Sequence, residues 1–113
     1  MPVFEVRGIK LDAEELLRAI AEMPGLVRSC GLHEICMERV VFHPDRAEVE
    51  FVPGDKEERV VAFGNAALMA LVLAWCKRIR VPIPQECTKV IEVTHSGVTL
   101  CISLQRRSGD RRR

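Results

Sequence analysis

The sequence predicts an α+β domain: an antiparallel sheet of two hairpins, plus a short N-terminal strand, packed on a long buried helix. Three observations support this class. The run from Val60 to Cys76 is apolar except at Asn65, two later stretches alternate across a turn, and an amphipathic pattern stands near the N-terminus. Paired strands separated by helices, with no repeated βαβ unit, favour an antiparallel sheet over a parallel one.

The N-terminal part predicts a strand over Val3–Val6 and then a helix over residues 12–23. Asp12 can cap the exposed amides of this helix, and Glu15 can reach back in a capping box. Pro24 and Gly25 end the pattern. The spacing of three and four residues gives the helix one buried stripe, formed by Ala13, Leu16, Leu17, Ile20 and Met23.

A first hairpin follows, with strands over 35–42 and 47–51. His43-Pro44-Asp45-Arg46 supplies the residues of a turn. The second strand alternates strictly, which turns Val49 and Phe51 inward and the glutamates outward. The first strand alternates poorly, so the register stays open.

The long helix is expected to start near Asp55 and Glu58, another capping pattern, and to run to Arg78 or Arg80. Pro82 stops it. A helix of about 25 residues would be about 37 Å long. A helix that is apolar on every side must be covered on every side.

The closing segment predicts a second hairpin, Thr88–Thr94 and Val98–Gln105, with Ser96-Gly97 as its loop. In that register Val93 faces Leu100 and Ile91 faces Ile102. One face is then apolar and the other polar.

Coverage of the long helix leads to a prediction of assembly. Four alanines spaced by four residues would form a flat ridge where another helix can approach closely: Ala62, Ala66, Ala70 and Ala74. The ridge would serve either a symmetric homodimer or the first helix of the same subunit. We expect the homodimer, since twofold assemblies are the commonest.

One cluster contains residue types that bind metal. Cys30, His33 and Cys36, with His43 across the hairpin, could in principle form a tetrahedral site. The spacing lacks the paired Cys-x-x-Cys of reliable zinc sites, so we expect neither a metal nor another cofactor. Five cysteines, an odd number without a signal peptide, favour a reducing, cytoplasmic setting, where thiols fill the core.

Charge divides the chain into a domain over 1–105 and a basic tail over 106–113, expected to be disordered. The tail has five Arg and one Asp, whereas the rest is mildly acidic. Contact with nucleic acid would therefore use the tail alone. A transmembrane reading of Val60–Cys76 is disfavoured, because the run is short and contains Gly64 and Asn65.

No motif specifies a reaction: a phosphate-binding glycine loop and a nucleophile elbow are both absent from the sequence. The leading hypothesis is a homodimeric interaction or adaptor module rather than an enzyme. The second is a ligand-binding or enzymatic domain with its pocket between sheet and long helix, using Cys36, His33 or His43. The third is an accessory protein that contacts nucleic acid through the arginine tail.

Overall fold

The computed structural model describes residues 2–29, 36–55 and 59–107. Within them the chain forms two three-stranded antiparallel sheets and three α-helices, which confirms the predicted α+β class. The predicted single sheet is thus two sheets. Within the described ranges, no helix combines the length and apolar character needed to cross a membrane.

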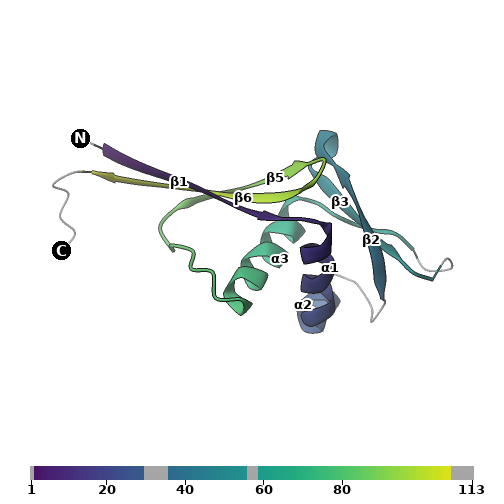
Figure 1. The fold of residues 1–113 in the computed structure, drawn as a ribbon. Coiled ribbons are helices and arrows are strands. Elements are labelled where there is room, and N and C mark those ends of the chain that lie inside the picture. Colours follow the sequence, from purple (N-terminus) through teal and green to yellow (C-terminus); the bar gives the residue numbers. More distant parts are fainter. Residues whose placement is uncertain (1, 30–35, 56–58, 108–113) are drawn as a thin grey trace.

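The first sheet, which we call sheet A, contains the two ends of the described chain. Its order is β1 (Pro2–Leu11), β6 (Gly97–Arg107) and β5 (Thr88–Thr94). Sheet B contains β2 (Met37–His43), β3 (Glu48–Pro53) and β4 (Val61–Phe63). Figure 1 shows α1 and α3 beneath sheet A, with sheet B beside them.

β1 and β6 are both longer than expected. β1 covers ten residues and pairs along its length with β6, from Pro2 opposite Arg107 to Leu11 opposite Val98. β6 therefore includes the first two residues that were assigned to the tail. The remainder of the predicted tail, residues 108–113, lies outside the described residues.

The predicted first helix is confirmed as α1 (Ala13–Glu22). Asp12 is its N-cap, and the Asp12 carboxylate accepts from the Glu15 amide at 2.8 Å. The buried face carries Leu16, Ala19 and Ile20. Pro24 does more than end this helix, because it begins a second short helix, α2 (Pro24–Ser29), where its fixed φ suits the first position.

The predicted first hairpin is also confirmed. β2 and β3 flank a 3-10 turn over Pro44–Arg46, and Val49 and Phe51 are fully buried. The structure fixes the register that the sequence left open, with Val40 opposite Phe51. An irregularity near the start of β2 accounts for the poor alternation there.

The second hairpin forms, but its predicted loop was wrong. The two-residue turn is His95-Ser96 rather than Ser96-Gly97, so Val93 faces Val98 and Ile91 faces Leu100. The register moves by two positions, which leaves the same side chains on the buried face. Gly97 is the first residue of β6 and lies close to β1: a Cβ there would be 2.6 Å from the Leu11 carbonyl oxygen, so the position requires glycine.

The prediction of one helix through Val60–Cys76 was wrong in its first part. Val61–Phe63 forms β4, which pairs with β3, and α3 covers only Asn65–Arg78. Its fourteen residues span about 21 Å rather than 37 Å. Asp55 lies ten residues before α3 and does not cap it, while Glu58 lies outside the described residues. The expected end at Arg78 is confirmed.

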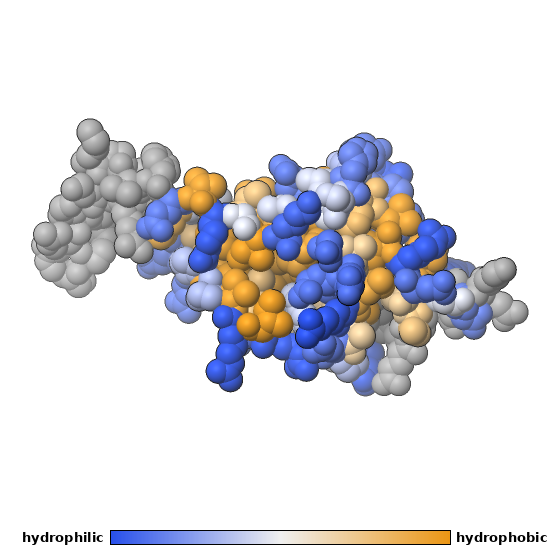
Figure 2. All heavy atoms as spheres, viewed as in Figure 1, coloured by the Kyte–Doolittle hydropathy of each residue, from blue (hydrophilic) through white to orange (hydrophobic). Residues whose placement is uncertain are grey.

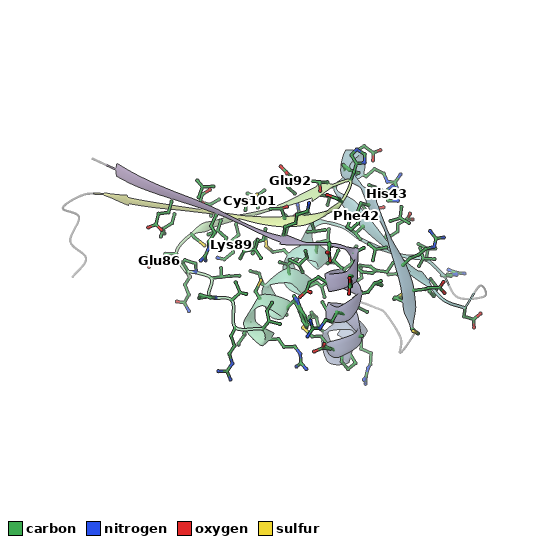
Figure 3. All side chains as sticks on the ribbon, viewed as in Figure 1. Phe42, His43, Glu86, Lys89, Glu92 and Cys101 are labelled. Carbon is green, nitrogen blue, oxygen red and sulfur yellow. The ribbon has the colours of Figure 1, made fainter. Side chains whose placement is uncertain are left out.

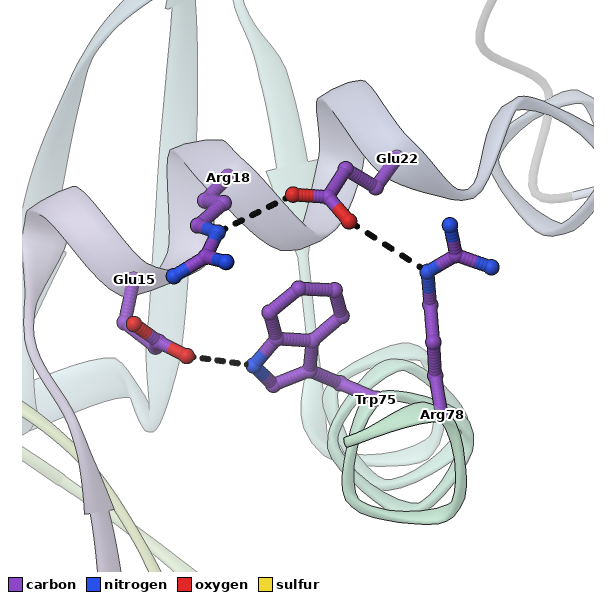
Figure 4. A network of polar contacts seen from close by, with 5 residues as sticks. All are labelled: Glu15, Arg18, Glu22, Trp75 and Arg78. Atoms are coloured by element: carbon purple, nitrogen blue, oxygen red, sulfur yellow. Dashed lines mark hydrogen bonds and ion pairs between the residues drawn. The ribbon is translucent and has the colours of Figure 1, made fainter. Parts of the chain in front are cut away.

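Within the core of the domain, Trp75 joins α3 to α1. Trp75 is 1% exposed, and its indole N–H donates to the Glu15 carboxylate at 2.7 Å. Arg18 lies 5.7 Å from the Trp75 ring and donates to Glu22, which also accepts from Arg78 (Figure 4). Glu15 therefore bonds Trp75 of α3, so that only the Asp12 half of the predicted capping box is observed.

Candidate functional site

A groove lies beside the C-terminal end of α3. Its volume is about 750 Å³. The walls come from α3, from the segment 79–87 that leads to β5, and from β5 itself. The lining residues are Leu73, Lys77, Arg80, Val81, Pro82, Ile83, Pro84, Gln85 and Lys89.

Backbone hydrogen bonds determine how the chain leaves α3 and shapes the groove. The Val81 amide donates to the Cys76 carbonyl at 2.8 Å, and the Arg80 amide donates to the Lys77 carbonyl at 3.3 Å. This is the Schellman arrangement, in which the residue after the cap is left-handed and usually glycine. Here that residue is Arg80, with a φ of 63°.

A non-glycine residue in this conformation costs about 1 kcal/mol of stability. The structure thus carries a local strain at a position that lines the groove. Arg80 in this conformation is exposed and lines the groove. Glycine would adopt the turn without strain but would provide no side chain to the groove.

Two side-chain bonds hold the rest of the segment. Arg7 of β1 donates to the Pro82 carbonyl at 2.7 Å, and the Cys87 thiol donates to the Pro84 carbonyl at 3.0 Å. Both acceptors belong to prolines, whose φ angles are fixed. The segment is therefore tied to β1 and stiffened by its own residues.

The groove combines an apolar floor with positive charge. Leu73, Val81 and Ile83 are half-buried and pack against the core. Lys77, Arg80 and Lys89 are its charged lining residues, and no carboxylate of the described residues lines it. Glu86 is exposed in the same segment but lies outside the lining. Figure 2 shows apolar and hydrophilic side chains side by side on the surface where α3 ends.

Lys89 comes from sheet A. It lies opposite Ile102, which is buried, so Lys89 belongs to the helix-facing side of the sheet. Cys101 and Glu92 lie on the other side (Figure 3). Lys89 is half-buried, in contrast to the exposed Lys77 and Arg80.

Of the four metal candidates, the structure describes Cys36 and His43. Cys30 and His33 lie outside the described residues. Cys36 immediately precedes β2 and His43 is its last residue, and the two lie roughly 20 Å apart at the rise of a strand, so these two side chains are too far apart to bind one ion. Within residues 2–29, 36–55 and 59–107, no three His, Cys, Asp or Glu side chains gather closely enough to hold a metal.

His43 has a different partner, Glu50 of β3. Its Nε2 is bonded to a Glu50 carboxylate oxygen, and both side chains are partly buried. The pair is diagonal across β2 and β3, since Glu50 lies opposite Val41. It lies at the polar surface of sheet B and away from the groove lining.

The alanine ridge is not one continuous helical surface. Ala62 lies on β4, whereas Ala66, Ala70 and Ala74 lie on α3. Ala66 and Ala70 are exposed, and α1 covers the Trp75 side instead. A role for the alanines in assembly stays a prediction.

One thiol is perturbed by its surroundings. Cys76 is fully buried in the core, and burial raises the pKa of its thiol, while the charge of Arg7 opposes the shift. Cys76 is therefore a packed core residue and not an activated nucleophile.

The sequence contained the groove residues but gave no reason to group them. In the sequence, Lys77 lies within the predicted long helix, Arg80 is one of its possible ends, and Pro82 stops it. Lys89 joins them only because β5 packs against α3. Comparisons of the chain with protein-family models, with curated proteins and with solved structures found no match.

Proposed function

We propose that this protein is a binding module whose groove accepts a small amphipathic anion. The ligand would carry an apolar body and one carboxylate or phosphate group. The proposal rests on one observation: three cationic side chains and no carboxylate surround a half-buried apolar floor.

The size and composition of the groove support this class of ligand. Small-molecule sites commonly measure about 300–1,000 Å³ and combine apolar walls with a few polar groups. Leu73, Val81 and Ile83 would contact the apolar body. Lys89, with Lys77 and Arg80, would bind the anionic group through charge-assisted hydrogen bonds.

The rigidity of the wall is a second source of support. The Schellman bonds, the Arg7–Pro82 contact and the prolines hold the segment before any ligand arrives. A site that is already ordered loses less conformational entropy on binding.

The side chains in the groove suit binding more than catalysis. Among the described residues, its lining has no imidazole, carboxylate, thiol or hydroxyl group. Of the residues that the enzymatic alternative would use, Cys36 and His43 are not among the lining residues, and His33 lies outside the described part of the chain.

Octanoate, octyl phosphate and octanol test the proposal with a constant apolar body. Titration followed by ¹⁵N amide shifts should show both anions moving the signals of residues 73–89, and octanol binding at least tenfold more weakly. Comparison of the two anions shows which head group the cations prefer. Binding should weaken with added salt, because exposed charges are screened.

Two variants identify the site. Lys89→Gln and Arg80→Gln should each weaken anion binding by about three- to tenfold, the range for one partly exposed charged contact. Arg59→Gln is the matched control, since Arg59 is exposed just before β4 and does not line the groove. Equal affinity for octanol, or shifts that avoid residues 73–89, would contradict the proposal.

A further inference from the structure

We propose that β1 pairs with β1 of a second copy of this chain, antiparallel and centred on Val6. Two copies of sheet A would then form one continuous six-stranded sheet. This inference does not depend on what the groove binds.

The free edge of β1 is the first argument. β1 is the end strand of sheet A, and no strand in the described part of the chain pairs with its other edge. At ten residues it is about twice the length of an average strand. Long regular edges are ready templates for another strand, and proteins usually shorten, bulge or cover them. β1 pairs with β6 in unbroken register, and no bulge interrupts it.

The position of β1 leaves room for a second copy. Figure 1 shows β1 along the outside of the sheet, with the β1–β6 ribbon projecting beyond the helices. β5 begins opposite Ser103, which itself lies opposite Val6. Residues 2–5 therefore extend past the third strand, and Val6 stands where this extension begins.

Symmetry restricts the possible registers. A twofold axis that relates two antiparallel strands of one sheet is perpendicular to the sheet, so both helical layers lie on the same side. Since side chains alternate between faces, residues with the same orientation must then be opposite each other. The axis must therefore pass midway between the two copies of one residue of β1, and not at the level of the peptide bond between two residues.

Charge favours the register centred on Val6 over its two neighbours. Centred on Val6, the pairing places Glu5 of each copy opposite Arg7 of the other. Centred on Glu5 or on Arg7, it places like charges opposite each other, which is destabilising. Glu5 and Arg7 are both exposed in the single chain.

The same register covers a large apolar side chain that is exposed in the single chain. Val6 is 76% exposed and would contact Val6 of the second copy. Arg7 can join the new pair without leaving Pro82, because one nitrogen makes that bond and a guanidinium has five donors.

Molar mass measured by light scattering on the full chain tests the charge pairing. The unmodified protein should be a dimer, and Glu5→Arg should shift it to monomer by opposing two arginines. The double variant Glu5→Arg/Arg7→Glu should restore the dimer, because the opposite charges face each other again. Ala70→Glu, on the open side of α3, should leave the dimer unchanged.

A crosslink tests the register. Val6→Cys should form a disulfide-linked dimer under mild oxidation, because directly opposite residues in antiparallel strands have Cα atoms about 4.5–5.5 Å apart. Val60→Cys is the control, as Val60 is 48% exposed and lies just before β4 of sheet B. It should crosslink no more than the unmodified chain.

The proposal is overturned by any of three results. The unmodified protein is a monomer at every concentration, or Glu5→Arg remains a dimer. The third is loss of the dimer in Ala70→Glu, which would assign the interface to α3.

Discussion

On one side of α3, Trp75 is buried against α1 and bonded to Glu15, whereas on the opposite side Ala66 and Ala70 face solvent. Helical spacing puts Ala66, Ala70, Leu73 and Lys77 on one stripe, which leads to the groove. Alanine is apolar by composition, yet it exposes little surface and is the best helix former. An open helix face made of alanine therefore resembles a buried one when residues are only counted as apolar.

The two sides of α3 therefore differ in function: one packs in the core and the other faces solvent. The Trp75 side joins the helices by filling the core and by satisfying the indole N–H. The open side has few partners within the described chain and ends at a cationic groove. Substitutions on the two sides should therefore have very different effects.

The largest effect is expected on the closed side. Trp75→Ala should lower the free energy of unfolding by about 3–5 kcal/mol, because it leaves a cavity between α1 and α3 and removes the partner of Glu15. Chemical denaturation measures this. Trp75→Phe, which keeps most of the ring but loses the N–H, should cost less. A loss below 1 kcal/mol for Trp75→Ala would show that α1 does not depend on α3.

The next effect concerns pH and Cys76, also on the buried side. Its raised pKa means that the folded state keeps the thiol proton to a higher pH than the unfolded state. The associated stability is present below the ordinary thiol pKa, about 8.5, and is lost as pH rises through the folded value. Urea melts between pH 7 and 10 should show this decline, with a slope of at most about 1.4 kcal/mol per pH unit.

Cys76→Ala is the control for that slope. It should reduce stability at neutral pH, since it removes a core side chain, and should flatten the decline at alkaline pH. If stability declined equally with pH in Cys76→Ala, the decline could not be assigned to the Cys76 thiol.

A smaller effect of opposite sign is expected where the open side ends. Arg80→Gly should raise the free energy of unfolding by about 0.5–1 kcal/mol, because glycine adopts the left-handed conformation without strain. The same variant should weaken binding of octyl phosphate. Arg78→Gly, inside the last turn, should instead destabilise the protein. If Arg80→Gly destabilised it as much as Arg78→Gly does, Arg80 would have a structural role.

The smallest effect is expected in the middle of the open side. Ala70→Glu should change the free energy of unfolding by no more than about 0.5 kcal/mol, as is usual for exposed positions. Ala19→Glu, on the buried face of α1, is the contrasting variant and should be severely destabilising. A large loss in Ala70→Glu would show that the open side is covered in solution.

Local patterns predicted those elements whose determinants are close together in the sequence. Asp12 marks the start of α1, Pro82 follows the end of α3, and the alternation around Phe51 marks β3. Each signal acts within a few residues, through a cap, a missing donor or a strand face.

The start of α3 could not be predicted in this way. Val61–Phe63 is apolar and β-branched or aromatic in part, so it suits a strand as well as a buried helix. β3 decides the outcome, because it pairs with these residues and brings Phe63 against Phe51, with ring centroids 5.0 Å apart. Gly64 then separates the strand from the helix, as its N-cap.

The candidate site shows the same limit more strongly. Lys77 and Lys89 are twelve positions apart, on a helix and a strand, and no spacing rule relates them. Their grouping depends on the left-handed Arg80 and on the Arg7–Pro82 bond, which joins residues 75 positions apart.

The sequence by itself determined the α+β class, the capped first helix, both hairpins and the end of α3, because short-range sterics and hydrogen bonding suffice for these. Only the tertiary structure decided the division into two sheets, the strand at Val61–Phe63, the turn at His95-Ser96 and the cationic groove. Each of these depends on a contact between distant segments, such as Gly97 against Leu11 or Arg7 against Pro82. Such contacts form when the whole chain folds, and no local pattern records them.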